Sequence, residues 1–139
     1  MPIPANISFH AQGVSIDALD SKALIEWLEQ VASEEKKRIN QISYTFCSDA
    51  ALLKINRQFL NHDYLTDILT FPYAYDPIEA EIFISIERVA ENAFERKQAF
   101  ITELKRVLVH GLLHMCGYND HTEAESKVMR AKENHYIRL

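Results

Sequence analysis

Two histidines one helical turn apart constrain this chain more than any other feature of its sequence. His110 and His114 lie in residues 103–116, where apolar residues recur at the spacing of a helix. Side chains four residues apart lie on one face of a helix, so the two imidazoles can bind the same divalent metal ion. Because this helix carries apolar residues on most of its sides, we expect it to be largely buried.

The residues after the second histidine offer a third ligand. Gly117 stands where a helix ends in a left-handed residue, a conformation that glycine adopts without steric strain. The chain can then fold back and bring Asp120 or His121 to the same ion. Three protein ligands leave positions for water, as in catalytic zinc sites. The alternative is that both histidines are ordinary helix residues, but the spacing and the glycine favour a metal site.

The composition indicates one globular domain spanning residues 1–139, with 47% apolar and 25% charged residues. No apolar run approaches the ~20 residues of a membrane span, and the N-terminus lacks the pattern of a secretory signal. We therefore expect a cytoplasmic protein with no membrane contact. The net charge of −5 counts against a broad basic surface for nucleic acid, but it leaves room for a local basic cleft.

Alternating and helical patterns of apolar residues succeed each other along the chain without a repeat. Thr122 and Glu125 form a capping box, and the charged run 34–38 is interpreted as the solvated end of the first helix. We expect an α+β fold, with one mixed sheet of about four strands packed with about five helices. The predicted strands are 7–9, 41–47, 66–72 and 81–86; the predicted helices are 21–37, 50–60, 88–97, 103–116 and a last one ending near 136; residues 74–79 are predicted as loop.

The metal segment resembles the signature of the YbeY family, metal-dependent, single-strand-specific endoribonucleases that mature ribosomal RNA in bacteria. The family reads H-G-x-L-H-x-x-G-Y-x-H, and this chain matches six of the seven fixed positions. At the seventh, Asp120 stands where the family has its third histidine, and His121 comes one residue later. The resemblance implies His110, His114 and Asp120 as metal ligands, with His121 as the alternative third ligand.

The same spacing is similar to that of the metzincin metalloproteases. Those enzymes carry a glutamate directly after the first histidine as general base, whereas this chain has Gly111 there. A protease is therefore the weaker interpretation.

A second stretch, residues 56–72, resembles the family pattern L-N-x-x-[YF]-R-x-x-D-x-P-T-D-V-L-S-F-P. It departs from the pattern at Leu60 and Leu65, where the family has arginine and proline, so one expected phosphate contact is missing. The resemblance spans roughly residues 40–136. The candidates for the substrate cleft are Thr66 and Asp67, which also suit a plain polar strand entry, and Arg57 and Arg88, which also suit surface positions.

Two functions are consistent with these patterns. The first is an endoribonuclease of ribosomal RNA maturation and ribosome quality control, with one Zn²⁺ or another divalent ion per chain and single-stranded ribosomal RNA as substrate. No catalytic group is assigned to it beyond the metal-bound water. The second is a non-catalytic, metal-stabilised factor that binds a ribosomal subunit or an assembly protein. We expect the first function.

Overall fold

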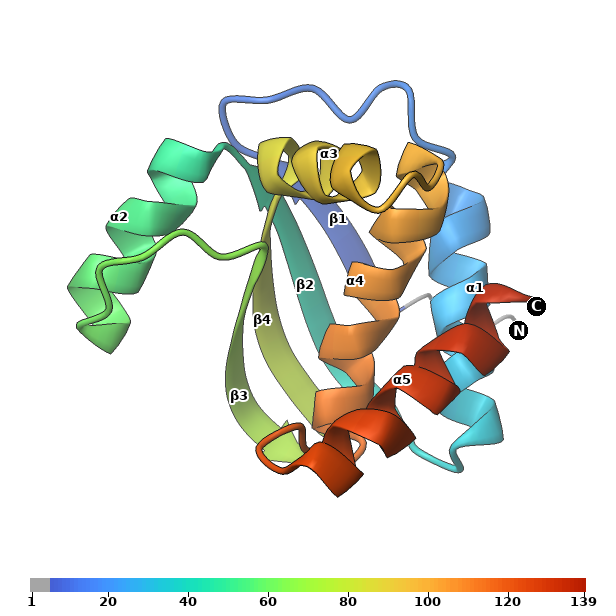
Figure 1. The fold of residues 1–139 in the computed structure, drawn as a ribbon. Coiled ribbons are helices and arrows are strands. Elements are labelled where there is room, and N and C mark those ends of the chain that lie inside the picture. Colours follow the sequence, from blue (N-terminus) through green and yellow to red (C-terminus); the bar gives the residue numbers. More distant parts are fainter. Residues whose placement is uncertain (1–5) are drawn as a thin grey trace.

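Four strands form one mixed sheet in the part of the chain that the computed structural model describes, residues 6–139 (Figure 1). The strand order is β1-β2-β4-β3, with β1, β2 and β4 parallel and β3 antiparallel to β4. The strands are β1 (Ile7–Ala11), β2 (Ile39–Cys47), β3 (Ile68–Tyr75) and β4 (Ile78–Ser85). The prediction of a mixed sheet of about four strands is confirmed.

Five helices pack around this sheet within the described residues, which confirms the α+β prediction. Helices α1 and α4 cover one face, α5 crosses α4, and α2 projects from the other side of the sheet (Figure 1). The predicted capping box of Thr122 and Glu125 is present. No helix in residues 6–139 is long and apolar enough to cross a membrane. The helices are α1 (Ser21–Glu34), α2 (Asp49–Leu60), α3 (Ile86–Glu95), α4 (Phe100–Met115) and α5 (Glu123–Ile137).

The core lies between α4 and one face of the sheet. Successive side chains of a strand point to opposite faces of the sheet. On the face that packs against α4, Tyr44 of β2 and Ile82 of β4 are buried in the core cluster. Leu108 and Leu112 of α4 belong to the same cluster, and the hydroxyl of Tyr44 donates a hydrogen bond to the carbonyl of Leu108 at 3.0 Å. The predicted burial of the histidine-bearing helix is confirmed.

A glycine between the two histidines lets α4 lie close to the sheet. A Cβ atom on Gly111 would lie 3.0 Å from Cδ1 of Ile68 and 3.1 Å from Cδ1 of Ile82. These distances are shorter than ordinary van der Waals contacts, so a Cβ atom at this position would require the tips of the two isoleucine side chains to shift by a few tenths of an ångström. The absence of a side chain at Gly111 thus permits this close approach of α4 to β3 and β4.

The third strand differs from its predicted bounds. The prediction of strand 66–72 followed by loop 74–79 is wrong, because β3 runs from Ile68 to Tyr75 and β4 begins at Ile78. A turn at Asp76-Pro77 joins them. Pro72 does not end the strand, since β3 is at the edge of the sheet, where a residue without a backbone N–H is tolerated.

The first helix is shorter than predicted. It ends at Glu34 rather than 37, because Lys36 adopts a left-handed conformation with φ of 59° and the N–H of Lys37 bonds to the carbonyl of Ala32. The run 34–38 is also not wholly solvated. The side chain of Glu35 is only 8% exposed and accepts hydrogen bonds from three side chains of later segments: Tyr118, Lys132 and Tyr136.

Candidate metal centre

The two histidines of α4 face each other at their Nε2 atoms. His110 and His114 lie one turn apart near the C-terminal end of the helix, and their Nε2 atoms are separated by 3.0 Å. Their rings stand nearly perpendicular, at 84°. Both side chains are about a quarter exposed, so the nitrogens are accessible from one side of a largely buried helix.

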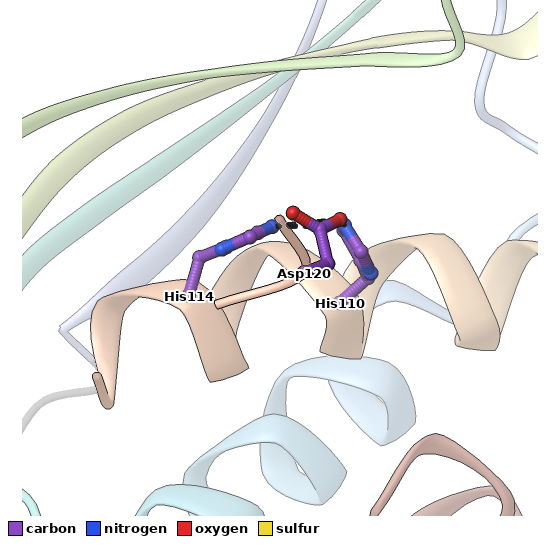
Figure 2. Close-up of side chains that lie close together, drawn as sticks. All are labelled: His110, His114 and Asp120. Atoms are coloured by element: carbon purple, nitrogen blue, oxygen red, sulfur yellow. Dashed lines mark hydrogen bonds and ion pairs between the residues drawn. The ribbon is translucent and has the colours of Figure 1, made fainter. Parts of the chain in front are cut away.

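The chain beyond α4 brings a carboxylate to the same point. Gly117 has a φ of 104° and turns the chain back after the helix, and the hydroxyl of Ser126 donates a hydrogen bond to the carbonyl of Asp120. Oδ2 of Asp120 lies 3.5 Å from Nε2 of His110 and 3.6 Å from Nε2 of His114 (Figure 2).

These three atoms have the separations that a metal ion requires. Zinc binds histidine nitrogen at about 2.0–2.1 Å and carboxylate oxygen at about 2.0–2.2 Å, so a tetrahedral ion holds its ligand atoms roughly 3.3–3.5 Å apart. The observed distances of 3.0, 3.5 and 3.6 Å bracket that value. His110, His114 and Asp120 can therefore hold one ion with little rearrangement. His121, the alternative third ligand, lines the neighbouring cleft but does not belong to this cluster.

A buried carboxylate supports the first histidine from behind. Oε2 of Glu133, on α5, lies 2.7 Å from Nδ1 of His110, and the side chain of Glu133 is only 5% exposed. A carboxylate accepts, so Nδ1 of His110 donates and the lone pair of Nε2 is left for a metal. Arg106 donates a hydrogen bond to the other oxygen of Glu133. Sequence reasoning missed this residue, because Glu133 is 23 positions from His110 and no local pattern connects them.

The two histidines have opposite pKa shifts. Burial alone would lower the pKa of His110, but the hydrogen bond and charge of Glu133 outweigh it and the pKa is raised. The pKa of His114 is lowered by burial and by the neighbouring His110. His114 is therefore held in the neutral form, in which an imidazole can bind a metal.

A cleft of about 530 Å³ opens beside the cluster. It is bounded by the start of β3 and by the loop that carries Asp120, and it includes two predicted substrate-cleft residues, Thr66 and Asp67. Burial raises the pKa of Asp67, although the nearby His110 opposes the shift. The cleft is thus a polar cavity with the candidate ligands on one wall.

The comparisons with known proteins show the family of this chain. The family model described as endoribonuclease YbeY matches residues 6–139. The chain belongs to the YbeY family. An endoribonuclease YbeY from Flavobacterium psychrophilum is 45% identical over 134 residues, covering 96% of this chain and 95% of the relative. One from Phocaeicola vulgatus is 42% identical, covering 96% and 97%.

A solved structure shares the fold of this YbeY chain. The solution structure of a Thermotoga maritima protein aligns with a TM-score of 0.73 at 30% identity, covering 95% of this chain and 87% of that one.

The two arginines suggested for the substrate cleft of this YbeY chain lie elsewhere. Within residues 6–139, the cavity beside the metal cluster is lined by neither of them. Arg57 forms an ion pair with Asp63 in the loop after α2. Arg88, on α3, forms an ion pair of 2.8 Å with Asp49 at the start of α2. The ion pair of Arg57 thus connects α2 to the loop after it, and the ion pair of Arg88 connects α3 to α2.

Proposed function

We propose that this chain is a metal-dependent endoribonuclease that cuts single-stranded RNA during ribosomal RNA maturation and ribosome quality control. The observation that carries this proposal is a cluster of three metal-ligand atoms beside an open polar cleft, in a chain of the YbeY family. Relatives that match nearly the whole chain are named endoribonucleases. We infer a cytoplasmic location, and a ribosomal subunit or its assembly proteins as partners, from that substrate.

We infer further that the resident ion is Zn²⁺, one per chain, held by His110, His114 and Asp120. Two imidazoles and one carboxylate form a normal donor set for zinc, and three protein ligands leave a position open. The separations of the ligand atoms support this assignment. When bound in such a site, a divalent ion polarises a phosphoryl oxygen and makes a water molecule more acidic.

The side chains around the cluster orient the first histidine and line the cleft. Glu133 fixes the ring of His110 through Nδ1. Thr66 and Asp67 line the cleft in which the RNA would lie. Burial raises the pKa of Asp67, whereas the charge of the nearby His110 opposes that shift.

A single-turnover cleavage assay on unstructured RNA tests the proposal. Zinc-loaded protein should cut the RNA, whereas metal-stripped protein and a His114→Ala variant should not, and added zinc should restore only the stripped protein. A zinc-loaded chain that binds a ribosomal subunit without cutting RNA would instead indicate a non-catalytic assembly factor. Digestion of casein under the same conditions would indicate a protease.

A further inference from the structure

A second, smaller cavity adjoins the metal cleft. Its volume is about 160 Å³, and it shares His110, Asp67 and Ile68 with the larger cleft. Three arginines line it, one from the end of α3, one from α4 and one from α5, and we call this cavity the arginine pocket: Arg96, Arg106 and Arg130. Three carboxylates line the same cavity, from the segment before β3, from α4 and from α5: Asp67, Glu103 and Glu133.

Two buried glutamates hold these arginines in place. Nη1 of Arg96 lies 2.8 Å from Oε2 of Glu103. Nη1 of Arg106 lies 3.1 Å, and Nε of Arg130 3.6 Å, from Oε1 of Glu133. The side chain of Glu103 is 1% exposed, whereas those of Arg96 and Arg130 are 49% and 62% exposed. The two glutamates therefore lie deeper than Arg96 and Arg130, and an entering group meets these two guanidinium groups first. Asp67, which also lines the larger cleft, is the third carboxylate of the pocket.

The guanidinium groups keep unused hydrogen-bond donors. Each has five N–H donors in a planar fork. Arg96 and Arg106 each donate one side-chain hydrogen bond to a glutamate within the described residues. The remaining N–H groups match the oxygens of a phosphate, which arginine binds in a bidentate manner. The glutamate paired with each guanidinium group therefore orients that group before an anion binds.

We propose that the arginine pocket binds a backbone phosphate of single-stranded RNA, next to the phosphate that lies at the metal centre. This inference rests on the proposed endoribonuclease function. The pocket and the cleft adjoin, since His110 and Asp67 line both of them, and RNA carries a phosphate at every nucleotide. The contact recognises no base, so it fixes the position of the RNA without setting its sequence.

Single-turnover cleavage by the zinc-loaded full chain tests this subsite. The half-saturating protein concentration and the maximal rate are measured on a labelled, unstructured RNA at several salt concentrations, together with zinc content. The variant is Arg96→Gln with Arg130→Gln. The matched control, Lys127→Gln with Arg138→Gln, removes two exposed cations that do not line the pocket.

The pocket variant should need a severalfold higher concentration for half-saturation, with an unchanged maximal rate and full zinc content. The logarithmic salt slope should fall by about 0.7 for each lost phosphate contact. The control should behave as wild type. If the double variant loses zinc or structure, the single variant Arg130→Gln decides, because within residues 6–139 the exposed Arg130 forms one ion pair, at 3.6 Å to Glu133.

If the pocket variant still cuts RNA with an unchanged half-saturating concentration and an unchanged salt slope, the proposed subsite is wrong. The proposed function would then still stand. A wild-type chain that cuts no RNA would overturn the proposed function, and the subsite with it.

Discussion

Glu133 determines the direction in which His110 presents its lone pair. The carboxylate accepts from Nδ1 at 2.7 Å and is itself held by Arg106. Burial alone would raise the pKa of Glu133, but the hydrogen bonds and charges of His110 and Arg106 lower it. The glutamate therefore remains charged beside the histidine, and a carboxylate in this position fixes the ring and makes Nε2 a better ligand.

We predict that Glu133→Ala lowers zinc affinity by roughly 10–100-fold, the usual effect of removing such a partner. Glu133→Gln keeps an oxygen acceptor and should lose less. Zinc affinity is measured by competition with a chromophoric chelator. Glu123→Ala, at an exposed position of the same helix, serves as control. Equal affinities for all four proteins would show that His110 does not depend on Glu133.

The third ligand is predicted to be Asp120 rather than His121. Among residues 6–139, the carboxylate of Asp120 is the one that forms a cluster with both histidine nitrogens. Asp120→Ala should therefore reduce zinc content and affinity strongly, whereas His121→Ala should leave them near the wild-type value. Zinc is measured by elemental analysis after dialysis. The opposite pattern, with zinc lost only in His121→Ala, would assign the ligand to His121.

The residues of the site were predictable to different degrees. His110 and His114 follow from spacing alone, since helical geometry places residues four apart on one face. The helix-ending glycine leaves both Asp120 and His121 open as the third ligand, and the choice of Asp120 rests on the resemblance to the family pattern. Glu133 and the arginine pocket could not be predicted, because they depend on how α5 crosses α4, which is a matter of packing rather than local pattern.

At the scale of elements, Glu35 connects the end of α1 to α5 and to the loop that follows α4. Its carboxylate accepts from Tyr118, one residue beyond Gly117, and from Lys132 and Tyr136 on α5. Burial raises the pKa of Glu35, but these hydrogen bonds outweigh it, and the net shift is downward. Folding therefore favours the charged form of this group.

A lowered pKa makes this contribution to stability depend on pH. The stabilisation is fully present above the unfolded value near 4.5 and is lost as the pH falls through the lower folded value. Glu35→Gln should lower the free energy of unfolding by roughly 1–3 kcal/mol at pH 7. The difference from wild type should shrink below about pH 4.5. Urea unfolding of metal-free protein from pH 3 to 7 measures it, and a constant difference would contradict the assignment.

Most elements of the fold were predictable, and their ends were not. The alternation of apolar and polar residues predicted β2 and β4, and capping residues predicted the starts of α2, α3 and α5. The exceptions depend on the environment of a residue. Pro72 continues β3 because the strand is at an edge, and Lys36 ends a helix in a conformation more typical of glycine. Glu35 resembles a solvated residue in sequence and is buried by segments far along the chain.

At the scale of the whole molecule, a bound metal should stabilise the fold. The candidate ligand atoms come from α4 and the loop before α5, so an ion bound there would join two segments that separate on unfolding. Zinc at about 100 times its dissociation constant should add about 2.7 kcal/mol, which raises Tm by several degrees.

Calorimetry with and without a chelator measures this increase in Tm. It should vanish in His110→Ala with His114→Ala, and it should diminish below about pH 6, where protons compete for free imidazole. The same Tm increase in the double variant would place the bound zinc elsewhere in the molecule.

The position of Asp120 has a consequence for how such a site evolves. Its side chain is 38% exposed and lies on a loop, whereas both histidines belong to a helix packed against the core. A substitution at Asp120, the candidate third ligand, therefore requires no repacking of the core, whereas a substitution of either histidine disturbs a helix that is packed against the core. Carboxylate oxygen suits harder ions such as Mn²⁺ and Mg²⁺ better than imidazole does. Single substitutions on this loop can thus retune the choice of metal in a lineage while the scaffold stays unchanged.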